Sequence, residues 1–143
     1  MAFKKVFDAL QMGVVDGQEN TWSNIYIKKF FEVQNGITET NHGVLDYLVV
    51  TSVDFWKTLP NGIRTQLTQI LEGVTKERNA ISARINQENK QKIIAAGTVV
   101  RQISAKQRQL WVSKMKPVWS QFEKNIGTDI IKAAVASNTM LSN

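Results

Sequence analysis

The sequence predicts a helix-rich α/β fold with one long helix and a few short strands. Apolar residues recur at helical spacing for most of the stretch from about Asn61 to about Ala96, as in an amphipathic helix. Three short apolar runs, at residues 37–40, 44–51 and 98–103, are strand candidates. Of the 143 residues, 43% are hydrophobic and 21% are charged, which is typical of a folded protein rather than a disordered one.

The first thirty residues are expected to form helical segments on either side of a polar turn. Five apolar residues recur at helical spacing and predict an amphipathic helix: Phe3, Val6, Phe7, Leu10 and Val14. This helix is expected to end at Gly13 or Gly17. The polar turn covers residues 16–20, and an aromatic-rich segment over residues 22–31 then indicates a short helix or loop packed on a core.

The long helix has recognisable start and stop signals. Ser52 is expected to cap a short preceding helix through Trp56, which stops at Leu59–Pro60. Pro60 suits the first turn of the long helix, where a missing N–H costs nothing, and Gly97 suits its end. At about 1.5 Å per residue this helix would be about 50 Å long, which exceeds the diameter of a small domain and indicates a larger protein.

The C-terminal third is expected to be helical. Ser104 and Gln107 match a capping box at the start of a helix. One face of that helix carries Trp111, Met115, Trp119, Phe122 and Ile126. Pro117 lies in its interior and is expected to kink it, because proline removes a hydrogen bond and crowds the preceding turn. Gly127 then separates it from a last helix that is expected to end near Ala136.

Composition and motifs argue against an enzyme. The chain has no cysteine and a single histidine, His42, which excludes disulfides, thiol nucleophiles and zinc sites built from thiolates or several imidazoles. No phosphate-binding, zinc-protease or serine-hydrolase motif occurs. His42 with Glu19 or Asp46 lacks a nearby serine or cysteine in a nucleophile context. We therefore expect a binding protein with no catalytic residue, no metal and no cofactor.

The net charge is positive but its carriers are dispersed. Eighteen lysines and arginines against twelve aspartates and glutamates give a formal net charge of +6. Most basic residues alternate with acidic or amide residues, as on a solvated helix face. Nucleic-acid binding usually requires clustered basic residues, so a basic helical nucleic-acid binder is only an alternative here.

A set of short motifs follows a fixed order along nearly the whole chain. They are Met1–Phe3, Phe7–Gln11, Gly13–Asn20, Asn24–Tyr26, Lys29–Gln34, Thr40–Gly43, Phe55–Trp56, Leu59–Pro60, Gln107–Arg108, Trp111, Lys116–Trp119, Phe122 and Ile126–Gly127. This ordered set closely resembles the DctP family, the extracytoplasmic solute-binding proteins of tripartite ATP-independent periplasmic (TRAP) transporters.

The resemblance implies a periplasmic receptor that captures a small organic anion, such as a C4-dicarboxylate or related carboxylate, for sodium-coupled uptake through TRAP membrane subunits. It further implies that residues 1–143 are a single partial unit, the C-terminal part of a two-lobe fold. The signal peptide, the N-terminal lobe and an arginine that clamps the ligand carboxylate are then expected upstream. The alternative is a structural or oligomeric remnant that associates with itself and binds no ligand of its own.

The family motifs assign four candidate ligand-site residues. Asn20 matches an asparagine whose amide helps to hold the ligand carboxylate, and Phe3 matches an aromatic residue that lines the cleft. Glu19 and His42 match polar residues at the edge of the cleft, where they are expected to pair with each other. Under the alternative interpretation, Phe3 is a core residue of the first helix, and the Glu19–His42 ion pair only joins two segments.

Overall fold

The computed structural model describes residues 1–140 as a series of helices with two short strands. In chain order the elements are a 3-10 turn at Phe3–Lys5, α1 (Val6–Gln11), α2 (Trp22–Ile27), a 3-10 turn at Phe30–Val33, β1 (Ile37–Glu39), α3 (Val53–Thr58), α4 (Asn61–Ala95), β2 (Val100–Gln102), α5 (Ala105–Ile126) and α6 (Thr128–Met140). They form two compact units, one from Met1 to Arg101 and one that begins at Gln102. The single partial unit that the family resemblance implies stays a prediction.

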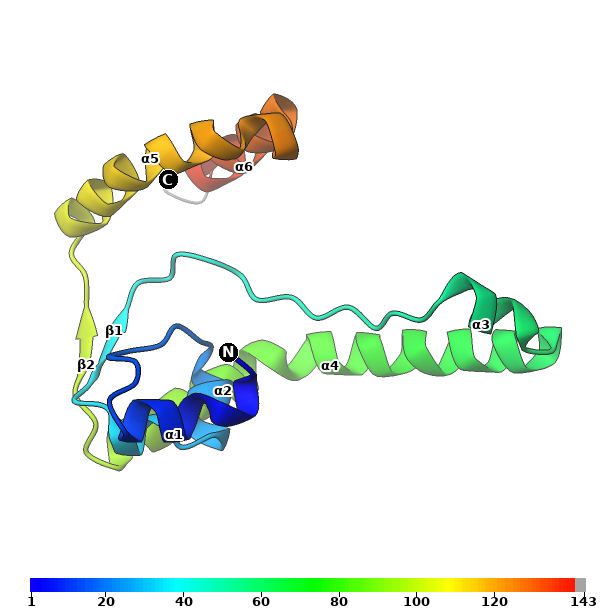
Figure 1. Ribbon diagram of the computed structural model, residues 1–143, viewed down its shortest axis with the longest axis horizontal. Helices are drawn as coiled ribbons and strands as arrows, with labels where there is room; N and C mark the ends of the chain where they lie inside the picture. The colour runs from blue at the N-terminus through cyan, green and yellow to red at the C-terminus, as the bar shows by residue number, and fades with distance from the viewer. Residues whose placement is uncertain (141–143) are drawn as a thin grey trace. The chain divides into compact units, whose positions relative to one another are not determined.

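The helix-rich fold with one long helix is confirmed, since α4 has 35 residues (Figure 1). Two of the three expected strands are present as β1 and β2, which pair in a parallel two-stranded sheet. The prediction of a strand at residues 44–51 is wrong, because these residues are exposed and belong to no strand. A strand is defined by hydrogen bonds to a neighbour, and β1 and β2 are the only strands within residues 1–140.

The capping signals in the sequence define the helix starts as expected. The hydroxyl of Ser52 accepts a hydrogen bond from the backbone N–H of Phe55 at 3.1 Å. At the start of α5, Ser104 and Gln107 form a complete capping box, with bonds of 3.3 and 2.8 Å. Gly97 follows α4 with a φ of 90°, in the left-handed region that glycine adopts without steric cost.

The core of the first unit lies between α1, α2 and the C-terminal part of α4. Leu10, Ile25, Phe30 and Ile93 form its centre, and the exposed fractions of Phe30 and Ile93 are only 1% and 0%. Partly buried apolar residues surround them: Val6, Phe7, Val15, Trp22, Tyr26, Phe31, Val33 and Ile37. Burial of each large apolar side chain contributes about 1.5–3 kcal/mol. The turn before α2 is thereby held against a packed scaffold.

Polar contacts join α4 to α2 and to β1. The ammonium of Lys90 lies 2.8 Å from both carboxylate oxygens of Glu39, and 5.3 Å from the centre of the Trp22 ring. The side chains of Lys90 and Glu39 are only 14% and 13% exposed. At the first turn of α2, the backbone N–H of Ser23 donates to Oδ1 of Asn86 at 3.0 Å, which satisfies a group that the helix itself leaves unpaired.

A glycine lets the chain enter β1 beside β2. A Cβ on Gly36 would lie 2.8 Å from the carbonyl oxygen of Val99, closer than real Cβ atoms approach. The next residue, Ile37, donates its N–H to that same carbonyl at 2.9 Å. Any other residue at position 36 would therefore push the two segments apart.

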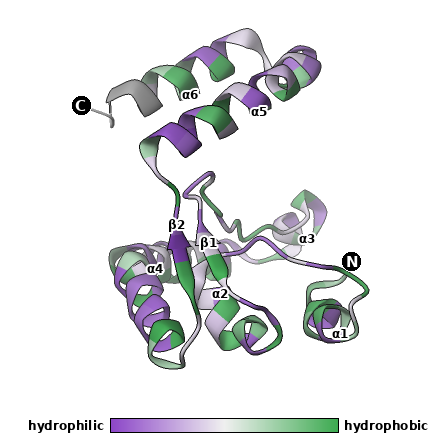
Figure 2. Cartoon of the chain, turned by 90° about the vertical axis from the view of Figure 1, so that its left-hand side faces the viewer, coloured by the Kyte–Doolittle hydropathy of each residue, from purple (hydrophilic) through white to green (hydrophobic). Residues whose placement is uncertain are grey.

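The second unit consists of α5 and α6, which pack against each other. Hydrophobic and hydrophilic bands alternate along both helices (Figure 2). Helix α5 continues past Pro117 to Ile126, and the expected kink stays a prediction. Helix α6 extends to Met140, beyond the end expected near Ala136. Within residues 1–140, no helix is both long and apolar enough to cross a membrane.

Candidate ligand site

The turn before α2 places Asn20 at a helix start. Asn20 is half-buried and directly precedes Thr21, the N-cap residue of α2. The hydroxyl of Thr21 accepts a hydrogen bond from the backbone N–H of Asn24 at 3.4 Å. Because α2 packs on the core, this cap fixes the backbone from which the Asn20 side chain projects.

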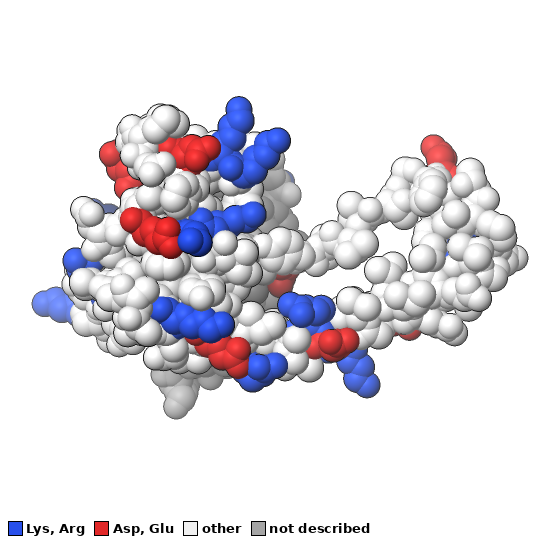
Figure 3. Space-filling view, turned by 90° about the horizontal axis from the view of Figure 1, so that it is seen from below, with Lys and Arg blue, Asp and Glu red and all other residues white. Residues whose placement is uncertain are grey.

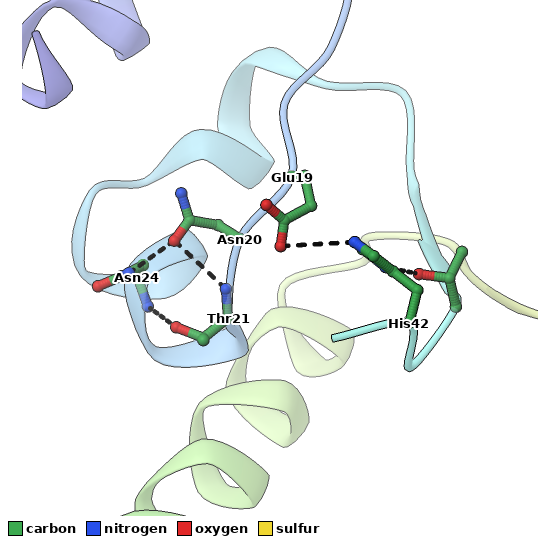
Figure 4. A network of polar contacts seen from close by, with 6 residues as sticks. Glu19, Asn20, Thr21, Asn24 and His42 are labelled. Carbon is green, nitrogen blue, oxygen red and sulfur yellow. Dashed lines mark hydrogen bonds and ion pairs between the residues drawn. The ribbon is translucent and has the colours of Figure 1, made fainter. Parts of the chain in front are cut away.

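The amide of Asn20 has a defined orientation. Its Oδ1 accepts hydrogen bonds from Nδ2 of Asn24 at 2.6 Å and from the backbone N–H of Thr21 at 3.3 Å. Since the oxygen faces α2, the nitrogen of the same amide points away from this network (Figure 4). An amide nitrogen carries two N–H donors, which are suited to a carboxylate and add no charge.

Glu19 and His42 come together from two segments of the chain. Nε2 of His42 lies 3.8 Å from Oε1 of Glu19, and Nδ1 of His42 lies 2.6 Å from the hydroxyl of Thr40 (Figure 4). Between Thr40 and His42, Asn41 adopts a left-handed conformation with a φ of 46°, which asparagine tolerates better than most residues. The Glu19 and His42 side chains are both more than half exposed, so their pairing adds little stability.

Phe3 lies at the rim of the core. Its ring packs edge-to-face against Phe30, with 5.7 Å between the ring centres, yet Phe3 as a whole is 43% exposed. The ammonium of Lys28 lies 5.7 Å from the centre of the Phe3 ring. Phe3 thus combines core packing on one side with an aromatic surface that a ligand or another segment can cover.

The four candidate residues do not form one contact network. Glu19 and Asn20 are adjacent in the turn and His42 reaches Glu19, whereas Phe3 contacts Phe30 and Lys28. In residues 1–140, no group of three or more histidine, aspartate or glutamate side chains gathers into a candidate metal site. The geometry offers donors and an aromatic edge for binding.

The sequence analysis did not predict two residues of the hydrogen-bond network around Asn20. Nδ2 of Asn24 donates both to Asn20 and to the phenol oxygen of Tyr47, at 3.1 Å. A signal for Asn24 exists, because residues 20 and 24 are four apart and flank the N-cap of a helix. Tyr47 has no such signal, since its contact joins residues 23 positions apart.

A separate groove lies along the first half of α4. It measures about 840 Å³ and lies between residues 49–57 and residues 64–76. Its lining mixes apolar side chains such as Trp56 and Leu71 with Lys57, Arg64 and Glu72. None of the four candidate residues lines it.

Charges of both signs are mixed on the surface. On the face drawn in Figure 3, lysine and arginine side chains lie next to aspartate and glutamate side chains. Two exposed ion pairs follow helical spacing, Lys29 with Glu32 and Arg84 with Glu88. Such mixing does not concentrate positive potential on that face.

Comparison with known proteins identifies the family. The family described as bacterial extracellular solute-binding protein, family 7 (DctP), matches residues 1–125. This chain belongs to that family. The resemblance drawn from the sequence motifs is therefore confirmed.

Relatives of the DctP family match nearly all of the chain. The C4-dicarboxylate-binding periplasmic protein DctP of Vibrio cholerae is 58% identical over 138 residues, which cover 96% of this chain and 42% of that protein. A TRAP periplasmic solute binding protein from Shewanella oneidensis, solved with bound succinate, is 49% identical with a TM-score of 0.89, over 94% of this chain and 44% of that one.

A third relative, from Pseudomonas aeruginosa PAO1, was solved with bound L-malate. It is 38% identical with a TM-score of 0.80, over 85% of this chain and 42% of that one. The chain thus spans about two fifths of the length of the relatives that it matches.

Proposed function

We propose that this chain is the C-terminal part of a periplasmic receptor that binds a C4-dicarboxylate for a TRAP transporter. The observation that carries the proposal is the amide of Asn20, whose donors point away from a network that occupies its oxygen. The similarity to proteins solved with succinate and with L-malate supports the same class of ligand. In this role the protein binds and releases its ligand and catalyses no reaction.

The site chemistry fits one end of a dicarboxylate. A carboxylate accepts several hydrogen bonds, and each buried donor that it loses costs about 1–3 kcal/mol. Asn20 supplies donors but no charge, so the positive partner of the ligand comes from elsewhere in the receptor. A guanidinium group suits that part, because its planar fork holds both oxygens of a carboxylate.

The other candidate residues are proposed to shape the edge of the cleft. Phe3 offers its exposed aromatic surface to the apolar carbons of the ligand while Phe30 holds its ring from behind. Glu19 and His42 place polar groups at this edge, where the segment around residue 42 meets the turn that carries Asn20. The membrane subunits of the transporter are the proposed protein partners.

The test uses a chimera in which this chain replaces the matching segment of Vibrio cholerae DctP. Titration calorimetry with succinate, L-malate and uncharged succinamide measures binding to the chimera and to the unaltered relative. We expect saturable binding of the two dicarboxylates and none of succinamide, which matches them in shape but lacks both charges. A folded chimera that binds none of the three, beside a relative that binds succinate, would refute the proposal.

A further inference from the structure

The amide of Asn20 is useful to a carboxylate in one orientation only. The terminal torsion of asparagine is broad and roughly two-fold, so the side chain can present either its oxygen or its nitrogen to the ligand. The oxygen would repel a carboxylate, whereas the nitrogen donates to it. Something in the protein must therefore select the nitrogen.

We propose that Asn24 is a positioning residue that selects this orientation, and that Tyr47 holds Asn24 in place. The inference rests on the proposed function of Asn20. Nδ2 of Asn24 lies 2.6 Å from Oδ1 of Asn20, the shortest contact of the network. A nitrogen donor at this place requires the oxygen of Asn20 to face it, and so directs the Asn20 nitrogen outward.

Asn24 is itself fixed from two sides. Its backbone N–H is bound by the cap hydroxyl of Thr21, which pins the start of its side chain. The second hydrogen on its Nδ2 points to the phenol oxygen of Tyr47 at 3.1 Å. If the Asn24 amide turned over, its oxygen would face the oxygen of Asn20, which the backbone N–H of Thr21 keeps on this side, and the bond between the two amides would be lost. The phenol of Tyr47 can donate as well as accept, so it holds the Asn24 side chain in place in either orientation.

The contact with Tyr47 extends the site to a segment that otherwise packs little. Tyr47 is 78% exposed, and Val44, Leu48, Val49 and Val50 around it are more than 80% exposed. A phenol oxygen bound to Asn24 connects this segment, through Asn24, to the ligand-facing amide of Asn20. Changes in the segment are therefore transmitted to Asn20 through two successive hydrogen bonds, from Tyr47 to Asn24 and from Asn24 to Asn20.

The first test needs no ligand. In the ¹⁵N-labelled 143-residue chain, nuclear Overhauser effects should link the Asn24 side-chain amide to the Tyr47 ring. Asn24→Asp replaces the donor by an acceptor of the same shape, so we expect the Asn20 amide to turn and its side-chain resonances to shift. Asn79→Asp, at an exposed position on α4, should leave them unchanged. Unshifted Asn20 resonances in Asn24→Asp would overturn the inference.

Asn24→Asp is expected to fold. Residue 24 is the third residue of α2, where an acidic side chain is favourable to the helix start. The helix content of each variant is checked by circular dichroism. Tyr47→Phe, which removes only the phenol oxygen, serves as a second and milder variant of the same network.

The second test measures coupling in the chimera with succinate. Asn24→Asp should weaken binding by about a hundredfold when Asn20 is present, because the ligand loses a donor and meets both an oxygen and a new negative charge. In an Asn20→Ala background Asn24→Asp acts only through its charge. The loss of succinate affinity that it causes there should be at least about tenfold smaller. Tyr47→Phe should weaken binding by about threefold, again only when Asn20 is present.

The outcomes separate the inference from the proposed function. Asn24→Asp could weaken succinate binding equally with Asn20 present and in Asn20→Ala. That result would show that the substitution acts only through its charge or a structural effect. It would overturn the inference but leave the proposed ligand site unaffected. If the single variant Asn20→Ala bound succinate with unchanged affinity, Asn20 would not contact the ligand. The positioning role proposed for Asn24 would then fail as well. Coupling together with shifted Asn20 resonances would support both.

Discussion

The two halves of α4 carry similar apolar stripes but have different surroundings. In the second half, Ile81 and Ile85 are half-buried and Ile93 is completely buried against α2 and its neighbours. In the first half, the corresponding side chains are between 36% and 59% exposed: Ile63, Leu67, Ile70, Leu71 and Val74. Helical periodicity thus predicts which side chains favour burial, but the contacts that bury them come from other segments.

The first half of α4 is flanked by segments that are themselves exposed. Residues 49–57, which include most of α3, lie along it and leave the open groove of about 840 Å³ between them and α4. An isolated helix gains little from its backbone hydrogen bonds alone, and packing supplies most of its stability. We therefore expect stability in the first unit to be concentrated around the second half of α4.

Two isoleucines on α4 provide the strongest test of this difference. Ile93→Ala should lower the free energy of unfolding by about 4 kcal/mol, because it leaves a cavity in the core. Ile70→Ala, at a site that is 59% exposed, should change it by less than about 1 kcal/mol. Urea unfolding followed by circular dichroism measures both. Similar losses at the two positions would mean that the halves are equally packed.

Two ion pairs on the second half of α4 extend the comparison from apolar to charged contacts. Lys90→Met leaves the carboxylate of Glu39, which is 13% exposed, without its ammonium partner and should cost about 3 kcal/mol. Arg84→Met removes the exposed partner of Glu88 and should have a much smaller effect. The same urea titration measures the free energy of unfolding of both variants. A larger decrease for Arg84→Met than for Lys90→Met would contradict the argument from burial.

We expect the chain to self-associate weakly through the exposed segment at residues 44–51. This is the smallest effect among the predictions. Apolar side chains that are more than 80% exposed favour contact with a second copy of the chain or with a complementary segment. Leu48→Lys and Val50→Lys should each weaken this association severalfold. Sedimentation at a series of concentrations measures it. A chain that stays monomeric at every concentration, with a sharp transition at high temperature, would be contrary to this expectation.

Local signals in the sequence predicted the elements that depend on local bonds. The caps at Ser52 and Ser104 and the start of α4 after Pro60 need only neighbouring residues, and each is present in the structure. The strand at residues 44–51 failed for the opposite reason. Its composition favours a strand, but a strand forms only where a partner offers free backbone groups.

In the candidate site, too, the features that depend on neighbouring residues could be predicted from the sequence, whereas those that depend on distant contacts could not. Asn20 could be assigned from the sequence motif, and its position beside an N-cap follows from Thr21. The orientation of its amide could not, because its oxygen is occupied by the backbone N–H of Thr21 and by the side chain of Asn24. Asn24 in turn contacts Tyr47 across 23 positions. The roles assigned to Phe3, Glu19 and His42 stay predictions.

The most direct test of the central claim is the effect of Asn20→Ala on succinate binding. In the chimera with Vibrio cholerae DctP, titration calorimetry should show a loss of about 1–3 kcal/mol, since the ligand carboxylate loses a buried donor. Asn79→Ala on the exposed face of α4 is the matched control and should leave the affinity unchanged. The 143-residue chain by itself should show no saturable binding at micromolar succinate. Tight binding by that chain, or an unchanged affinity in Asn20→Ala, would contradict the account.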